Sequence, residues 1–543
     1  MSFQKEKDNE KSSTVDVTML SDGDEVSEIK NPDLYTRLFY AQRYLETQYE
    51  EIKSEKLFGA FNTKIKNSLT INKLEPTSDD YPKLNTVEQT LRTAHWFSCA
   101  GLLTAEIMGA IVVPYSLGIL GYVPGNLLLV FLFFLTLLSG GVIWWLFLLL
   151  DSPEFPVRTF SDIAFVIGGE YCRQAVTFLQ IVGMILTTAG AVLASAQTII
   201  LIRTERVCWI GIVLLIAGTQ AIVGHIKQLS NLGKICLFVS FTNYISLFVQ
   251  MGYMGKPNYA NALSLLGLEE APVMKYAFTP NQPLIDRVVG ASNIAYVFAG
   301  SIVFPEIISE MRRPWEFWKS LLVAEGCILV IYLLFGNYVY SKQGQFSLTP
   351  AVFGISDEKA LKGLCLITFL TGFIQSVFYG HISCKIAFKN YMPMLFKNLD
   401  LSTKRGTFLW SATVLTIWIC VFIIAAGVPQ VSAVGSFTSA LTMIPLTFCF
   451  PFIFQIWGLF VTANASNIDS FDCSTLTVIQ KPQTFMVKIS TGFRHHWFLS
   501  TLYLGLGLGA LAFAGLGIYS SVEYMKVLFA ISSATSFSCV SPV

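Results

Sequence analysis

The chain has 543 residues, of which 53% are apolar and only 13% are charged, and its formal net charge is +1. This composition is too apolar for an ordinary soluble domain. The balanced charge, with basic residues in short groups between apolar runs, excludes nucleic-acid binding as the main activity. We therefore expect most of the chain to lie in a lipid bilayer.

Residues 1–93 are polar and form the predicted cytoplasmic N-terminal tail, which we expect to be largely disordered. The tail contains an acidic patch at Asp22, Asp24 and Glu25, followed by one possible helix from Pro32 to about Leu57. The alternative is a regulatory segment that folds back on the membrane domain or binds regulatory partners.

Apolar runs long enough to cross a hydrocarbon layer of ~30 Å, about 20 residues each, recur through the rest of the chain. They predict an all-α polytopic membrane domain at 94–522, then a short non-cytoplasmic tail at 523–543. Segment 151–173 has the pattern of an amphipathic surface helix. The eleven expected spans are 95–120, 124–150, 176–202, 207–224, 230–254, 288–310, 318–340, 360–382, 407–427, 431–462 and 497–520.

The distribution of basic residues predicts the orientation of these spans. With a cytoplasmic N-terminus, Arg158, Arg312 and Lys385 lie among the larger set of basic residues on the inner side. Eleven spans then leave the C-terminus outside. The sequon at Asn464 falls on the cytoplasmic side in this topology, so we expect it to carry no glycan.

Several function classes leave no trace in the sequence. The five histidines form no HExxH motif, and no GxxxxGK[ST] loop is present, so we predict neither an enzyme nor an ATP-driven pump. We expect no cofactor and no metal. The eleven cysteines are scattered singly, which favours small core residues. A channel is disfavoured because no loop resembles a repeated selectivity filter.

Two matched interruptions are the most informative feature of the sequence. Gly109–Pro114 in the first span and Gly300–Pro305 in the sixth both read Gly-small-Ile-Val-apolar-Pro. Glycine and proline weaken a helix, and backbone groups freed at membrane depth persist only where they line a cavity or hold a ligand. This spacing predicts discontinuous helices 1 and 6 in a 5+5 inverted repeat with one extra helix. The alternative is that glycine and proline merely kink these helices.

A break of this kind suits a zwitterionic ligand. Free amides at a half-helix N-terminus attract a carboxylate, and exposed carbonyls at a half-helix C-terminus attract an ammonium group or a cation.

From about residue 93 to 540 the chain resembles the amino acid/auxin permease family, most closely its fungal branch of neutral amino acid permeases. The motifs that carry the resemblance are Gly109–Pro114, Gly121-Tyr-Val-Pro124, Asn293–Ser301, Glu310-Met-Arg-Arg-Pro314 and Gly515–Val522. Two positions depart from the family pattern: Ile107 stands where relatives often have glycine, and Ser301 where they often have histidine.

The resemblance implies a leucine-transporter-type secondary active transporter that imports neutral aliphatic and aromatic L-amino acids with alternating access. It implies a co-transported proton, with sodium possible as in some relatives, and residence in the plasma membrane, with the vacuolar membrane as the alternative. A non-transporting amino acid receptor on the same fold stays open.

The candidate site residues follow from these motifs. Tyr115 and Phe298 are candidates for gating or for setting the pocket volume. Glu106 and Glu325 are candidates for proton coupling because ionisable groups inside spans are costly, and pairing with a neighbouring helix is the alternative. Thr368 and Thr371 mark a possible sodium site, against hydroxyls that bond back to their own helix. The predicted substrate-binding residues are Gly109, Ala110, Ile111, Pro114, Asn293, Tyr296, Phe298, Ala299, Gly300 and Ser301.

Overall fold

The structure is a computed structural model, and it describes most of the membrane domain and parts of both termini. The described residues are 18–19, 27–28, 34–48, 59–71, 92–202, 207–225, 232–391, 403–428, 430–465, 468–472, 477–480, 485–531 and 537–540.

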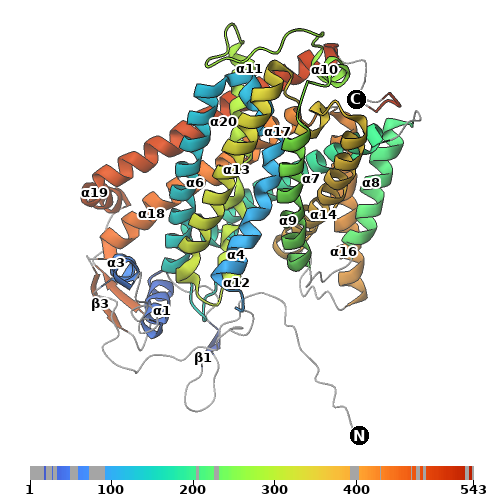
Figure 1. The fold of residues 1–543 in the computed structure, drawn as a ribbon. Coiled ribbons are helices and arrows are strands. Elements are labelled where there is room, and N and C mark those ends of the chain that lie inside the picture. Colours follow the sequence, from blue (N-terminus) through green and yellow to red (C-terminus); the bar gives the residue numbers. More distant parts are fainter. Residues whose placement is uncertain are drawn as a thin grey trace.

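Most of the described chain is helical, and the helices run between two opposite ends of the molecule (Figure 1). The end that carries α1 (Leu34–Thr47) and α3 (Gly59–Leu69) is called the N-terminal end below. The end that carries α10 (Tyr259–Leu266) and residues 537–540 is called the C-terminal end. Two short hairpins are also described, β1 (Thr18–Met19) with β2 (Ser27–Glu28) and β3 (Ile468–Asp472) with β4 (Thr477–Gln480).

Each of the eleven predicted spans has a helical counterpart. Among the residues that the structure describes, eight helical stretches are long and apolar enough to cross a membrane, and Gly109–Leu120 and Trp209–Gly224 are shorter apolar helices. The spans that lie within one helix each are found in α6 (Tyr122–Leu150), α7 (Phe160–Ile202), α8 (Trp209–Gly224), α9 (Leu232–Tyr253), α13 (Phe317–Gln343), α14 (Glu358–Asn390), α16 (Lys404–Gly427) and α20 (Trp497–Ile531). The remaining short elements are η5 (Pro314–Glu316), η6 (Gly344–Phe346), η7 (Ala351–Gly354) and α19 (Phe485–His495). The polytopic helical fold is therefore confirmed.

The first and sixth spans are interrupted, as the matched hexapeptides predict. The first span consists of α4 (Trp96–Leu103), the 3-10 helix η3 (Thr104–Ile111) and α5 (Val113–Leu120). The sixth consists of α11 (Leu284–Tyr296), η4 (Gly300–Val303) and α12 (Phe304–Glu310). Pro114 and Pro305 lie in the first turn of each second half, where the missing amide donor costs no helical hydrogen bond.

The tenth span contains a distortion that the sequence analysis did not predict. Its helices α17 (Val431–Thr438) and α18 (Phe450–Ala465) are joined by two π-helical segments, η8 (Ser439–Met443) and η9 (Pro445–Cys449). Such π-helical turns are frequent at functional sites. This distortion lies directly beside η4 and α11 of the sixth span.

The predicted surface helix at 151–173 is right only in part. Residues 151–159 are not helical, which fits Pro153 and Pro156, and the helical part begins at Phe160. It meets the third span at Gly169, whose φ of 71° and ψ of −165° break α7 into two helices.

The helices divide around two apolar cores. One core contains residues of α4, α5, α6, α11, α12 and α13, and the second contains residues of α8 and α16, while α7 and α14 contribute residues to both. Within the second, α7 contacts α14 and α8 contacts α16, so corresponding members of the two halves lie side by side. The last helix, α20, contacts α11, α17 and α18.

Part of the N-terminal tail is ordered against the membrane domain. The helix α1 contacts α6, and the Tyr40 ring lies edge-on to Phe155 with ring centres 5.6 Å apart. Residues 1–17, 20–26, 29–33, 49–58 and 72–91 of the tail lie outside the described residues. The predicted disorder of the tail and the boundaries at 93 and 522 stay predictions, and α20 continues to Ile531.

The cysteine prediction was wrong for one pair. Cys208, which precedes α8, forms a disulfide with Cys539, 331 residues away in sequence. The Trp209 amide donates to the Cys539 carbonyl at 3.2 Å, and the Phe537 amide donates to the Ala426 carbonyl at 3.2 Å. The C-terminal segment is therefore fastened to the ends of α8 and α16. Scattered spacing gave no sign of this pair because only the fold brings the two residues together.

Candidate functional site

The two helix interruptions meet each other. Gly109 faces Val297, and a Cβ atom placed on Gly109 would lie 2.6 Å from the Val297 Cβ and Cγ1 atoms. Contact this close is possible only without a side chain at position 109, because real Cβ atoms do not approach within 3.0 Å. The first and sixth spans therefore touch at their breaks, which the kink alternative does not require.

Side chains from three other helices donate hydrogen bonds to carbonyl groups of the sixth-span break. Thr136 of α6 donates its hydroxyl to the Phe298 carbonyl at 3.3 Å, and Thr447 of η9 donates to the Ala299 carbonyl at 3.4 Å. Gln180 of α7 donates its amide to the Ile302 carbonyl at 3.1 Å. All three donors are buried. The break is thus a stable feature of the fold, since unpaired carbonyls at this depth would be costly.

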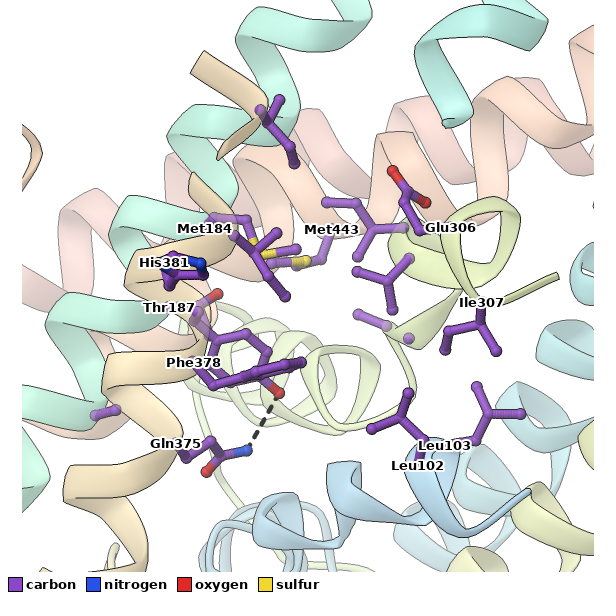
Figure 2. Close-up of a pocket in the computed structure, with 18 of the residues that line it drawn as sticks. Leu102, Leu103, Met184, Thr187, Glu306, Ile307, Gln375, Phe378, His381 and Met443 are labelled. Carbon is purple, nitrogen blue, oxygen red and sulfur yellow. Dashed lines mark hydrogen bonds between the residues drawn. The ribbon is translucent and has the colours of Figure 1, made fainter. Parts of the chain in front are cut away.

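A cavity of about 1020 Å³ opens beside the breaks (Figure 2). In Figure 2 Met184, Thr187 and His381 lie on one wall, and Leu102, Leu103 and Ile307 lie on the opposite one. Gln375 donates its side-chain amide to the Tyr379 hydroxyl at 3.1 Å on the same helix. Helices of both apolar cores contribute lining residues, so the cavity lies between the two groups of helices.

The cavity leads toward the N-terminal end of the molecule. Its lining there includes side chains of α1, of the segment before α4 and of the loop after α6, namely Tyr44, Arg92, Pro153, Pro156, Arg158 and Thr159. The cavity lining also includes Glu306 and Glu310 of α12 and Lys385 of α14. These residues lie on the parts of the two helices that run toward the N-terminal end.

Hydrogen bonds close the opposite side. The Tyr115 hydroxyl of α5 pairs with the Tyr524 hydroxyl of α20 at 2.7 Å, and the Tyr524 hydroxyl donates to the Gln430 Oε1 atom at 3.4 Å. Tyr115, which the sequence placed as a gate candidate, therefore joins the first span to the last helix and to the start of the tenth. The described lining thus reaches the N-terminal end and includes no residue of α10 or of residues 537–540 at the C-terminal end.

A buried ion pair stabilises the mouth of the cavity. The Arg92 guanidinium binds Asp151 in bidentate fashion, with both nitrogen–oxygen distances at 2.9 Å. The Asp151 side chain is only 3% exposed and also accepts the Val157 amide at 3.0 Å. Burial raises the pKa of the Asp151 carboxyl above its ordinary value, although Arg92 opposes the shift. The pair holds the segment before α4 against the end of α6.

The structure brings some of the predicted substrate residues to the cavity and leaves others behind it. The cavity is lined by Gly109, Ile111, Tyr296, Ala299 and Gly300. Buried positions outside the described lining are Ala110, Pro114, Asn293, Phe298 and Ser301. The substrate role of all ten residues stays a prediction.

The coupling candidates differ in position. The side chain of Glu106 lies outside the described residues. Glu325 is buried on α13 and is absent from the described cavity lining. Thr368 lines the cavity, and its hydroxyl donates to the Leu364 carbonyl at 2.9 Å, while the Thr371 hydroxyl donates to the Ile367 carbonyl at 3.0 Å. Both hydroxyls thus bond to their own helix, and the sodium site stays a prediction.

Several lining residues were missed by the sequence analysis. Thr187, Gln375, Tyr379 and His381 are polar groups on the third and eighth spans, and all line the cavity. His381 is 3% exposed, and neither ring nitrogen has a hydrogen-bond partner among the described residues. The sequence marks these four residues only as polar residues inside apolar spans, which makes them candidates for the site. It does not say which face of each helix is turned toward the cavity.

The fold and the cavity define a membrane transporter with a central site between broken helices, and the comparisons agree. Residues 92–467 match the family described as transmembrane amino acid transporter protein, and the chain belongs to this family. It is 26% identical over 348 residues to a "Transmembrane transporter" of Gibberella moniliformis, covering 63% of this chain and 71% of the relative. It is 22% identical over 369 residues to the "N amino acid transport system protein" of Neurospora crassa, covering 64% and 73%.

Proposed function

We propose that the chain is a secondary active transporter that imports neutral aliphatic and aromatic L-amino acids by proton symport with alternating access. The observation that carries the proposal is the contact between the two breaks beside a cavity whose lining reaches the N-terminal end and not the C-terminal end. The carbonyls of Phe298, Ala299 and Ile302 already accept hydrogen bonds, so a zwitterion would bind the other backbone groups of the two breaks inside the bilayer. A cavity closed at one end is the form that alternating access requires of one of its two states.

The lining beside the breaks supports a neutral side chain on the substrate. Ile111, Val112, Val297, Met184 and Met443 surround this part of the cavity, and all are apolar. A charged side chain would lose hydration against these five residues without gaining a partner from them, although Glu306 and His381 also line the cavity. Tyr296 and Phe378 add aromatic surface, which favours large aliphatic and aromatic substrates.

Proton coupling is proposed in preference to sodium coupling. The hydroxyls of Thr368 and Thr371 donate to carbonyls of their own helix, which leaves their oxygen lone pairs free, so these bonds do not decide between sodium and a proton. The carboxyls of Glu306 and Glu310 and the imidazole of His381 line the cavity and are groups that can carry a proton.

Uptake by the purified chain in liposomes tests the proposal. Labelled leucine, phenylalanine, lysine and glutamate are offered with an inward pH gradient, with and without sodium. We expect saturable accumulation of leucine and phenylalanine that needs the pH gradient and ignores sodium. Accumulation that needs sodium would overturn proton coupling. Binding without accumulation would favour an amino acid receptor.

We also propose that the N-terminus is cytoplasmic and that the cavity is open to the cytoplasm. The disulfide lies at the C-terminal end, opposite α1 (Figure 1). Disulfides persist outside the cell or in oxidising lumina, whereas cytosolic thiols stay reduced. An epitope at the N-terminus should become accessible to antibody only after permeabilisation, and accessibility in intact cells would contradict this orientation.

We propose that the protein resides in the plasma membrane. We also propose that the N-terminal tail is the segment that regulatory partners bind. The tail is suited to regulation because α1 carries Tyr44, which lines the mouth of the cavity. A fluorescent fusion distinguishes the plasma membrane from the vacuolar membrane. Removal of residues 1–48 should alter the uptake rate, and an unchanged rate would contradict a regulatory tail.

A further inference from the structure

One tyrosine of the helix α13 lies at the point where the two breaks touch. The Tyr332 side chain is fully buried, and its hydroxyl donates to the Val297 carbonyl at 3.1 Å. A Cβ atom on Gly109 would lie 2.7 Å from the same hydroxyl oxygen. One oxygen atom thus sits over the first-span break and binds the sixth-span break.

The ring of Tyr332 makes a second contact with the sixth span. It lies edge-on to the Phe298 ring, with ring centres 5.4 Å apart. Val297 and Phe298 form the first two positions after α11, where the helix is interrupted. Tyr332 therefore holds both of these residues, through its hydroxyl and through its ring.

We propose that Tyr332 is a positioning residue that sets the separation of the first- and sixth-span breaks and so the geometry of substrate binding. This inference rests on the proposed function for its transport consequences. Without the hydroxyl, the Val297 carbonyl would lose its hydrogen bond from α13, and an unpaired carbonyl inside the membrane domain is costly. The backbone of the break would then shift to recover a partner.

The inference has a distinctive consequence for different substrates. The broken backbones recognise the carboxylate and ammonium groups that all amino acids share, whereas cavity side chains recognise the part that varies. A change in the separation of the breaks should raise KM by the same factor for alanine, leucine and phenylalanine. A residue that contacts only the variable part would change these KM values unequally.

The test compares Tyr332→Phe with Tyr340→Phe. Both tyrosines are buried on α13, and both variants lose one hydroxyl, but the Tyr340 hydroxyl accepts the Tyr276 amide at 3.2 Å, away from the breaks. We expect Tyr332→Phe to raise KM about tenfold for all three amino acids. Tyr340→Phe should leave KM within twofold of the wild type. The amount of each variant in the membrane is measured in parallel.

Hydrogen exchange of the amides at 297–302 tests the role of Tyr332 independently of transport. We expect their exchange rates to change at least about fivefold in Tyr332→Phe and to stay unchanged in Tyr340→Phe. Equal exchange in both variants, or a KM that is unchanged or rises unequally, would overturn the inference. Absence of wild-type uptake would instead refute the proposed function, and the exchange measurement would still decide the role of Tyr332.

Discussion

Replacing Gly109 with alanine should weaken amino acid uptake, because the position has no room for a side chain. The added Cβ atom would lie 2.6 Å from two atoms of Val297 and 2.7 Å from the Tyr332 hydroxyl oxygen. Ordinary contact begins at 3.4 Å, so the breaks must separate by about 0.8 Å. The Val297 Cβ is fixed to the backbone, and therefore the backbone of the sixth span has to move.

The expected cost of this overpacking is about 1–3 kcal/mol. Since 1.4 kcal/mol corresponds to a factor of ten, the KM for leucine should rise by up to about 150-fold, the limit reached when the whole cost falls on the substrate-bound state. Alanine also favours helix by about 1 kcal/mol relative to glycine, which would promote closure of the break and add to the loss.

The assay is uptake of labelled leucine by cells that lack their own leucine permeases, with the protein level measured by a fluorescent fusion. Gly326→Ala is the matched control, because a Cβ at Gly326 of α13 meets nothing within 4 Å. The control should transport like the wild type. If Gly109→Ala has a KM within twofold of the wild type, the contact between the breaks does not govern substrate binding.

Three further outcomes are expected. Arg92→Gln should lower the free energy of unfolding by about 3–5 kcal/mol because it leaves Asp151 buried without its cation. Because the folded-state pKa of Asp151 is raised, its charge penalty applies above that pKa and disappears as the pH falls toward the ordinary value of 3.8. Thermal denaturation of this variant should therefore approach the wild type at low pH, and a constant difference from pH 8 to pH 4 would contradict this. Cys208→Ser and Cys539→Ser should each lower the unfolding temperature by the same amount as the double variant, and unequal effects would argue against the disulfide. Asn464 should carry no glycan because its side-chain nitrogen donates to the Phe460 and Lys488 carbonyls at 2.8 and 2.9 Å, so a mobility shift after glycosidase treatment would contradict the structure.

The sequence predicted the helical fold and the breaks because both leave local signals. Long apolar runs reveal spans, and the pairs Gly109 with Pro114 and Gly300 with Pro305 mark the interruptions. These signals do not depend on how the helices are arranged.

The groups that complete the site could not be predicted in this way. Thr136, Gln180, Tyr332 and Thr447 are single polar residues on four different helices, and each donates to a carbonyl between Val297 and Ile302. Their common role follows only from the tertiary arrangement. A polar residue in an apolar span signals a buried partner but does not identify it.

Two hydrogen bonds at the N-terminal end link the broken spans a second time. The Ala94 amide donates to the Glu310 carbonyl at 3.0 Å, and the Arg312 amide donates to the Ala94 carbonyl at 2.9 Å.

The fastening of the C-terminal segment has a mechanical consequence. The helix α20 lies against α11 and α17, whereas the residues that follow it are joined covalently to the start of α8. The last helix and the residues after it therefore link the helices of the broken spans to α8 and α16. The length of chain between Ile531 and Cys539 limits how far these two groups can separate on that face during each cycle. Such a restraint would leave the opposite face freer to open.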